Sequence, residues 1–272
     1  MRKISLLLSF LTYITISHSQ TLEWEKFSKK GEYKETIAGI GGASSEAVDV
    51  LYTVENSGRL FDSYPPLFGK IQLGKAEFSA TKFIFYSGNK IYTIENSGSL
   101  YEVSTKDGTW KQVGRPGDWK ATIAGTILNG SLYTAESSGA LYRTNLKTGE
   151  WSKIGKPDFI NTKFMVAANN RLYTIEKDGT LYEIDPDDGL WKQLGKSGGW
   201  AATVYAVVCL GKMYSIESNG AFYETNLKTG AWKLLGKIDF KPGFLMSAEW
   251  GYLYAVDSAG FLYGLNLKDI KN

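Results

Sequence analysis

The sequence has 272 residues, with 31 basic and 28 acidic side chains and a formal net charge of +3. A charge this close to neutral excludes the strongly basic surface with which proteins bind nucleic acid. The only histidine is His18, so everything that follows it lacks the commonest general base and metal ligand at neutral pH.

The chain begins with the pattern of a secretory signal peptide. Met1 to Lys3 supply basic charge, Ile4 to Ile16 form an apolar run, and Ser17 to Ser19 end it with small residues. We therefore expect a signal peptide over residues 1–19, a single mature domain over 20–272, and a secreted, extracellular protein. The apolar run is shorter than the roughly 20 residues that cross a bilayer, and no later run is long enough, so we expect no membrane insertion.

The first predicted strand of the mature chain, Trp24–Phe27, has no complementary strand beside it in the sequence. A repeat follows it. One five-residue phrase of the type Leu-Tyr-Thr-Ile-Glu occurs six times, at steps of 40, 41, 40, 41 and 40 residues. The six copies begin at Leu51, Ile91, Leu132, Leu172, Met213 and Leu253. Short β-branched and aromatic runs between glycine turns fill each period, which excludes helical arrays and favours a propeller.

Each repeat predicts four antiparallel strands, as in a propeller blade. The last repeat ends after its third strand, Leu262–Leu267, and Trp24–Phe27 supplies the missing fourth. A ring brings the two ends of the chain together and leaves no sheet edge open. The sequence therefore predicts an all-β fold, a six-bladed β-propeller closed by its N-terminal strand.

The connections into the first strand of each repeat carry a second periodicity. They alternate between a Phe form and a mostly Trp form, at steps of 81 residues except for one step of 86. Five extra residues in the Gly41–Asp49 segment account for the longer step. The ring is therefore a pseudo-threefold array of repeat pairs. The six aromatic residues are Tyr33, Phe78, Trp119, Phe159, Trp200 and Phe240.

These connections are the candidate ligand site. Flat aromatic rings beside carboxylates and glycine amides suit a sugar, which needs a stacking surface and fixed polar partners. The other interpretation is that the rings wedge between repeats as core, and it is favoured for the three Phe residues. The predicted ligand-binding residues are Tyr33, Asp118, Trp119, Gly199 and Trp200.

One acid ends each copy of the recurring phrase. A ring of carboxylates near a propeller axis suits Ca²⁺, which prefers oxygen ligands. The alternative, that each acid bonds its own turn or a lysine such as Lys82 or Lys163, is favoured because a true site usually breaks the symmetry of its scaffold. We therefore expect no metal and no cofactor. The six acids are Glu55, Glu95, Glu136, Glu176, Glu217 and Asp257.

Three further features have structural interpretations. Asp185–Gly189 lacks the ligand spacing of an EF-hand and is expected to be a turn. Cys209 lies in an apolar run and is expected to be a buried thiol. A tryptophan recurs on the outermost strand, where it is expected to pin that strand to the sheet; its copies are Trp24, Trp110, Trp151, Trp191 and Trp232.

Several segments resemble the blades of tachylectin-type propeller lectins. They are Gly198-Gly199-Trp200 followed by an apolar strand, Lys163-Phe164-Met165, Lys82–Tyr86 and Tyr64-Pro65-Pro66. The resemblance covers most of the mature chain and implies sites for N-acetylated sugars between neighbouring blades. This chain has six repeats where the best-known member has five blades, and it lacks the Asp-Asn-Trp element of the family's sugar site.

Together these patterns predict a secreted, non-enzymatic, lectin-like propeller that binds glycans or glycoproteins through several weak sites on one face. The absence of histidine from the mature chain argues against catalysis by a Ser-His-Asp or Cys-His pairing. Two alternatives stay open. One is a structural, matrix or protein-interaction propeller, and the other is a glycosidase-like enzyme that uses paired carboxylates.

Overall fold

The computed structural model describes residues 22–43, 48–248 and 250–270. The predicted signal peptide, residues 1–19, lies outside the described residues. Among the residues described, no helix is long and apolar enough to cross a membrane.

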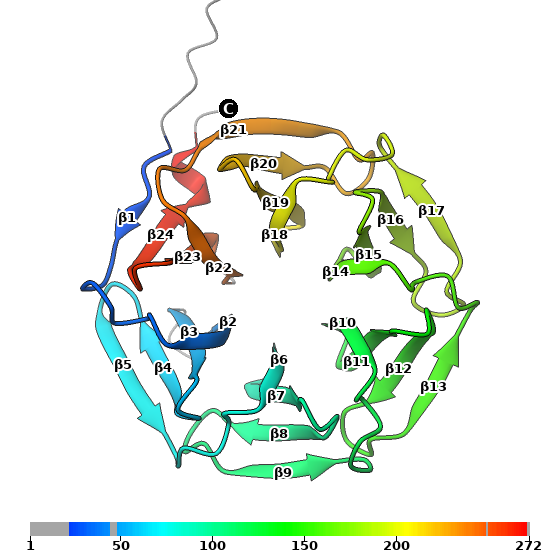
Figure 1. Ribbon diagram of the computed structural model, residues 1–272, viewed down its shortest axis with the longest axis horizontal. Coiled ribbons are helices and arrows are strands. Elements are labelled where there is room, and N and C mark those ends of the chain that lie inside the picture. The colour runs from blue at the N-terminus through cyan, green and yellow to red at the C-terminus, as the bar shows by residue number, and fades with distance from the viewer. Residues whose placement is uncertain (1–21, 44–47, 249, 271–272) are drawn as a thin grey trace, which may run out of the picture.

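Six four-stranded antiparallel sheets surround a common axis, which confirms the six-bladed β-propeller (Figure 1). We number the blades 1 to 6 in chain order. The innermost strands are β2 (Thr36–Ala43), β6 (Thr81–Ser87), β10 (Thr122–Leu128), β14 (Thr162–Ala168), β18 (Thr203–Cys209) and β22 (Pro242–Ser247). The second strands are β3 (Asp49–Glu55), β7 (Lys90–Glu95), β11 (Ser131–Glu136), β15 (Arg171–Glu176), β19 (Lys212–Glu217) and β23 (Tyr252–Asp257).

The third strands are β4 (Leu60–Tyr64), β8 (Leu100–Ser104), β12 (Leu141–Asn145), β16 (Leu181–Ile184), β20 (Ala221–Thr225) and β24 (Leu262–Asn266). The outermost strands are β5 (Phe68–Leu73), β9 (Trp110–Val113), β13 (Trp151–Ile154), β17 (Trp191–Leu194), β21 (Trp232–Lys237) and β1 (Glu25–Lys26). A 3₁₀ turn, η1 (Leu267–Asp269), follows β24.

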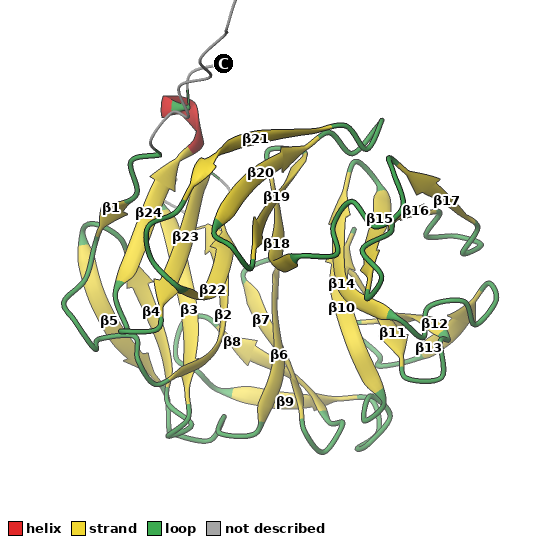
Figure 2. Ribbon diagram, turned by 45° about the horizontal axis from the view of Figure 1, so that its top comes forward, coloured by secondary structure: helices red, strands yellow, loops and turns green. Residues whose placement is uncertain are grey.

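The core lies between neighbouring blades. Each second strand is covered on both faces, and this explains why the recurring phrase is buried along almost its whole length in β3, β7, β11 and β15. The outermost strands lie at the rim of the ring (Figure 2). Their residues are exposed except for one or two that point inward. Burial of the apolar side chains of adjacent sheets holds the ring together.

The ring closes as the sequence predicts. β1 pairs with β24, with Glu25 opposite Gly264 and Lys26 opposite Tyr263. Figure 1 shows this N-terminal strand beside the C-terminal blade. Blade 6 therefore contains strands from both ends of the chain, and among the described strands no blade lacks its fourth member.

Each innermost strand begins with a β-bulge. In blade 3 the irregularity lies between Thr122 and Ala124, and the five other blades have it at the equivalent position. A bulge bends a strand and re-aims the side chain beside it. Here it leaves Thr122 opposite Glu136, the acid that ends the second strand.

A glycine contact joins successive blades at the rim. Gly149, in the turn before β13, has φ +75°, and a Cβ at this position would overlap the backbone of Gly114, which follows β9 in the preceding blade. The Lys-Thr-Gly turn therefore requires glycine for two reasons, a left-handed conformation and a close approach of two backbones.

Candidate functional site

The connection tryptophans of the predicted sugar site are part of the core. Trp119 is 2% exposed and Trp200 is 3% exposed. The Nε1–H of Trp119 donates to the Thr144 hydroxyl at 3.3 Å, and that of Trp200 donates to Thr225 at 3.3 Å. Trp119 packs among side chains of blades 2 and 3. Their rings therefore wedge between blades, and the expectation that they offer a stacking face to a sugar is wrong.

Tyr33, at the equivalent position of blade 1, is also buried. Its hydroxyl donates to Ser63 at 3.2 Å, and burial raises its pKa to about 12. Phe78 and Phe159 are buried in the same way, as the sequence favours, and Phe240 is half-buried. The aromatic residues of the connections thus serve mainly to pack one blade on the next.

Tryptophans of the outermost strands have the exposed rings instead. Trp110, Trp151 and Trp191 are 43–46% exposed, and each still contacts the neighbouring third strand, in agreement with the expectation that they pin the outermost strand to the sheet. Each ring meets a tyrosine of the third strand at a steep angle: in blade 3, Trp151 and Tyr142 lie 5.0 Å apart at 83°. The equivalent pairs are Trp110 with Tyr101 and Trp191 with Tyr182.

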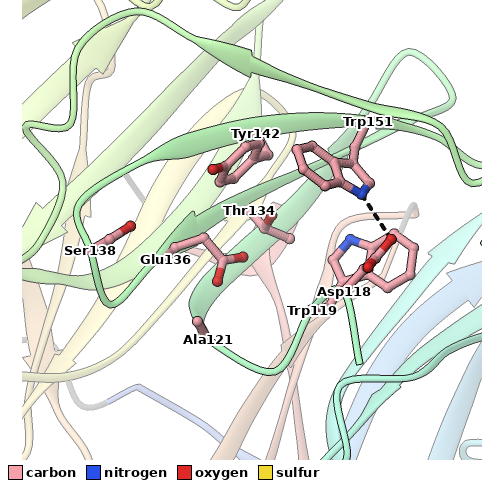
Figure 3. Close-up of a pocket in the computed structure, with 8 residues that line it drawn as sticks. All are labelled: Asp118, Trp119, Ala121, Thr134, Glu136, Ser138, Tyr142 and Trp151. Carbon is pink, nitrogen blue, oxygen red and sulfur yellow. Dashed lines mark hydrogen bonds between the residues drawn. The ribbon is translucent and has the colours of Figure 1, made fainter. Parts of the chain in front are cut away.

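An acid of the connection fixes each of these indoles. Trp151 Nε1–H donates to Asp118 at 2.9 Å, as Figure 3 shows. Trp110 donates in the same way to Glu77 at 2.8 Å, and Trp191 to Asp158 at 2.9 Å. The residue before the buried aromatic therefore orients the exposed one, 33 positions further along the chain.

The pair of rings and the acid form a pocket on blade 3 (Figure 3). Its volume is about 230 Å³. That is smaller than the roughly 300–1,000 Å³ typical of small-molecule sites, so it fits a side chain or a single ring. Its lining residues are Asp118, Trp119, Ala121, Thr134, Glu136, Ser138, Tyr142 and Trp151.

Glu136 lies in the same pocket. It is 6% exposed, and its carboxylate accepts a hydrogen bond from Thr122 at 2.9 Å. Burial raises its pKa, an effect that the hydrogen bonds and the charge of Lys82 partly offset. Glu95 and Glu176 are held by Thr81 and Thr162 in the same way.

Five of the six acids, all except Glu217, accept a hydrogen bond or form an ion pair with a local partner. No group of three or more metal-ligating side chains occurs within the described ranges. Asp257 accepts bonds from its own turn, as expected, through the backbone N–H groups of Ala259 and Phe261 at 2.9 Å. The expected pairing with a lysine occurs at Glu55, whose partner is Lys70. Lys82 and Lys163 instead donate to the backbone carbonyls of Thr122 and Thr203 in the next blade.

Pockets of the same design occur on blades 2 and 4. The pocket of blade 2 has a volume of about 230 Å³ and that of blade 4 about 170 Å³. In blade 2 the lining residues are Glu77, Phe78, Ala80, Glu95, Ser97, Tyr101 and Trp110. In blade 4 they are Asp158, Phe159, Asn161, Glu176, Asp178, Tyr182 and Trp191. Three consecutive blades therefore offer the same aromatic and acidic groups.

Blade 5 differs at the connection acid. Gly199 takes the place of Asp118, and the space lined by Gly199, Trp200 and Trp232 is only about 10 Å³. That is no more than a single water needs. Of the predicted site residues, the structure thus places Asp118 and Trp119 in one open pocket and Gly199 and Trp200 in a closed one. Tyr33 lines none of the pockets described here.

Two structural interpretations from the sequence are confirmed. Asp185–Gly189 is a turn, in which Asp185 accepts a hydrogen bond from the N–H of Asp187 at 3.0 Å. Cys209 is buried, and burial raises the pKa of its thiol to about 11.

The sequence shows no match to known protein families or to curated proteins. Among solved structures, a structural genomics protein of unknown function from Bacteroides thetaiotaomicron has 12% identity and a TM-score of 0.64, over 91% of this chain and 73% of that one. Streptogramin B lyase has 12% identity and a TM-score of 0.58, over 90% and 87% of the two chains. BamB from Moraxella catarrhalis has 14% identity and a TM-score of 0.51, over 85% of each chain.

Likeness at such identities shows the fold alone. The resemblance to tachylectin-type lectins is supported as far as the propeller fold, and no family match supports it further.

Proposed function

We propose that this protein is a non-enzymatic binding protein that holds a repetitive partner through equivalent pockets on successive blades. One observation carries the proposal: blades 2, 3 and 4 each combine an exposed tryptophan, a tyrosine and a buried glutamate around a pocket of similar size. Repeated weak sites on one rigid body give avidity, because the second contact is made at high effective concentration.

The chemistry of the pockets supports binding over catalysis. A glycosidase-like enzyme needs one carboxyl group as acid and a second, free one as base or nucleophile. In these pockets the connection acid already accepts the indole N–H, as Asp118 does from Trp151. In blades 2 and 3 only the glutamate that ends the second strand is left for a ligand. Blade 4 also has Asp178 in its lining, and this carboxylate already accepts the backbone N–H of Thr180.

A carbohydrate ligand stays a prediction from the sequence. If a sugar binds, the stacking faces are those of the exposed rings Trp110, Trp151 and Trp191, because the rings of Trp119 and Trp200 are buried. The protein is proposed to act outside the cell, on the pattern of residues 1–19. A protein-interaction role uses the same pockets and differs only in the partner.

The experiment is binding of the chain from Gln20 onward to dense arrays of glycans and of peptides. Its key variant combines Trp110→Ala, Trp151→Ala and Trp191→Ala. Exposed side chains are truncated with little loss of stability, so the variant should stay folded, as thermal unfolding will check. We expect it to lose at least about tenfold in apparent affinity for the arrayed partner.

Trp232→Ala is the matched control. Trp232 is also exposed and also meets a tyrosine, but it lies over the closed pocket of blade 5. Its removal should leave binding unchanged. Binding that survives the triple variant, or no retention by any array, contradicts the proposed function.

A further inference from the structure

Blade 1 fills its own pocket position with a cation. The pairing of Leu60 with Leu73 corresponds to that of Leu141 with Ile154 in blade 3, so counting back along β5 puts Lys70 at the position of Trp151. The sequence thus replaces the exposed tryptophan by a lysine in this blade alone among blades 1 to 5.

The ammonium group of Lys70 is surrounded by the residues that correspond to the pocket lining of blades 2, 3 and 4. It donates to the carboxylate of Glu55 and to the backbone carbonyl of Glu32, the latter at 3.2 Å. It lies 4.3 Å from the centre of the Phe61 ring and 5.0 Å from that of Tyr33. Its four neighbours occupy the positions of the acid, the connection residues and the tyrosine that line the open pockets.

This arrangement is a favourable setting for an ammonium ion. A cation within about 6 Å of an aromatic centre is attracted to the ring, more strongly where water is excluded. A buried carboxylate adds a charge-assisted hydrogen bond. Side-chain atoms of Lys70 are only 7% exposed, so the charge is compensated by these contacts and not by water.

The open pockets of blades 2 and 4 have these groups and lack the cation. Their linings contain two and three carboxyl groups and no lysine or arginine. Glu95 and Glu176 are 8% and 7% exposed, and neither forms an ion pair with a lysine or arginine of the described chain. Glu95 therefore faces its pocket with no cation acting on its charge. At Glu176 the charge of Lys177 is opposed by that of Asp178, which lines the same pocket.

We propose that the pockets of blades 2 and 4 bind an alkylammonium group, such as a lysine side chain of a partner, in the way that blade 1 holds Lys70. The inference rests on the proposed function and names the ligand class for the same pockets. A volume of about 170–230 Å³ suits a side chain that enters end-on.

The pocket of blade 3 should bind the same ligand more weakly, so it provides a comparison within the same molecule. Its pocket has the same rings and acids, but Lys82 of blade 2 lies close enough to act on the charge of Glu136. Arg115 also pairs with Asp118 at 3.5 Å. Because like charges repel, these two cations should weaken the binding of an ammonium group in the pocket of blade 3 relative to its binding in the pockets of blades 2 and 4.

The test follows the indole N–H signals of Trp110, Trp151 and Trp191 by nuclear magnetic resonance, assigned with single Trp→Phe variants. Two matched pairs of probes are titrated at pH 7. Nα-acetyl-lysine amide is compared with its Nε-acetylated form, and glucosamine with N-acetylglucosamine. Within each pair acetylation removes the positive charge, and the two pairs distinguish a lysine source from an amino-sugar source.

We expect the charged member of a pair to shift the Trp110 and Trp191 signals with a midpoint in the millimolar range, at least about tenfold below that of its acetylated form. The Trp151 signal should respond more weakly. Glu176→Gln should abolish the response of Trp191 and leave that of Trp110, whereas Glu95→Gln should do the reverse. The unaffected pocket in each variant shows that the protein is folded.

Equal responses to the charged and acetylated probes, or responses that survive the matching Glu→Gln change, overturn the ammonium inference. A selective response to N-acetylglucosamine overturns it while supporting the proposed function with a sugar ligand. If no probe moves an indole signal and the arrays also retain nothing, the proposed function fails as well.

Discussion

Each open pocket is lined by a buried glutamate, and burial of a carboxylate is unfavourable for the stability of the fold. Glu95 lies under the rings of blade 2, with a threonine hydroxyl as its hydrogen-bond donor and Glu77 and Tyr101 as further titratable groups in the lining. Burial raises its pKa above the ordinary value of 4.5, because a carboxylate loses hydration there. Glutamine would keep the shape and the hydrogen bond without the charge.

The pH dependence of stability tests this description of Glu95. A raised folded-state pKa means that the folded protein binds more protons than the unfolded chain between the two pKa values, so stability falls as the pH rises through that window. Glu95→Gln removes this loss. We expect the variant to match the parent near pH 4 and to be more stable at pH 8, as measured by urea unfolding at both values. A variant that is less stable than the parent at pH 8 but not near pH 4 would show that the charge contributes favourably to the fold.

At the scale of strands and turns, the blades are joined by close backbone contacts as well as by apolar side chains. Gly149 contacts Gly114, and in the next blade pair Gly230 contacts Gly195 in the same way. These turns are the Lys-Thr-Gly segments that recur in the sequence. The turn between the third and fourth strands therefore determines how closely one blade approaches the blade before it.

Substitution of this glycine separates steric overlap from backbone strain. Gly149→Ala should destabilise the protein by about 3 kcal/mol, from the left-handed conformation and the overlap with Gly114 together. Gly130→Ala is the matched control, since Gly130 has φ +72° but nothing within 4 Å of its added Cβ. The Gly130→Ala variant should lose only about 1 kcal/mol of unfolding free energy. Equal losses in denaturant unfolding would show that the contact between blades contributes nothing.

The same elements show what a sequence can and cannot predict. The strands, their order and the shared sixth blade follow from local patterns, namely alternation, glycine turns and the truncated last repeat. The pockets do not, because Trp119 and Trp151 both recur regularly and look alike in the sequence. Which ring is buried depends on Thr144 and Asp118, partners that lie 25 and 33 positions away. The recurring tyrosine of the third strand, beside a recurring tryptophan, was the signal that would have indicated the pocket.

At the scale of the whole molecule, the equivalent pocket position differs from blade to blade around the ring. It is filled by Lys70 in blade 1, open in blades 2 to 4 and closed in blade 5. In blade 6 the ring of Phe240 stacks on Tyr263 at 4.1 Å and 3°. The open pockets are therefore consecutive, which places them along one arc of the ring (Figure 1). A partner with evenly spaced groups would meet this arc before the rest of the ring.

The closed pocket of blade 5 allows a gain of function to be predicted. A Cβ at Gly199 would lie 3.9 Å from Trp232 Nε1 and 3.1 Å from the carbonyl of Lys196, so a small shift of that carbonyl admits a side chain. Gly199→Asp should then accept the indole N–H as Asp118 does in blade 3, and draw the ring of Trp232 away from the pocket. We expect a downfield shift of the Trp232 indole signal and a severalfold gain in apparent affinity for a surface dense in lysine, because a fourth pocket extends the arc.

Gly199→Asn is the control for this gain, because it offers an acceptor to the same indole without the negative charge. If the charge of the connection acid also attracts the ligand, the aspartate variant should gain more affinity than the asparagine variant, and the difference should shrink as salt screens the interaction. An equal gain from both variants would mean that opening the pocket is sufficient and that the aromatic pair carries the binding. No gain from either, with the indole signal shifted as expected, would mean that a partner reaches no further than the three pockets already open, and avidity would then be limited by the geometry of the arc.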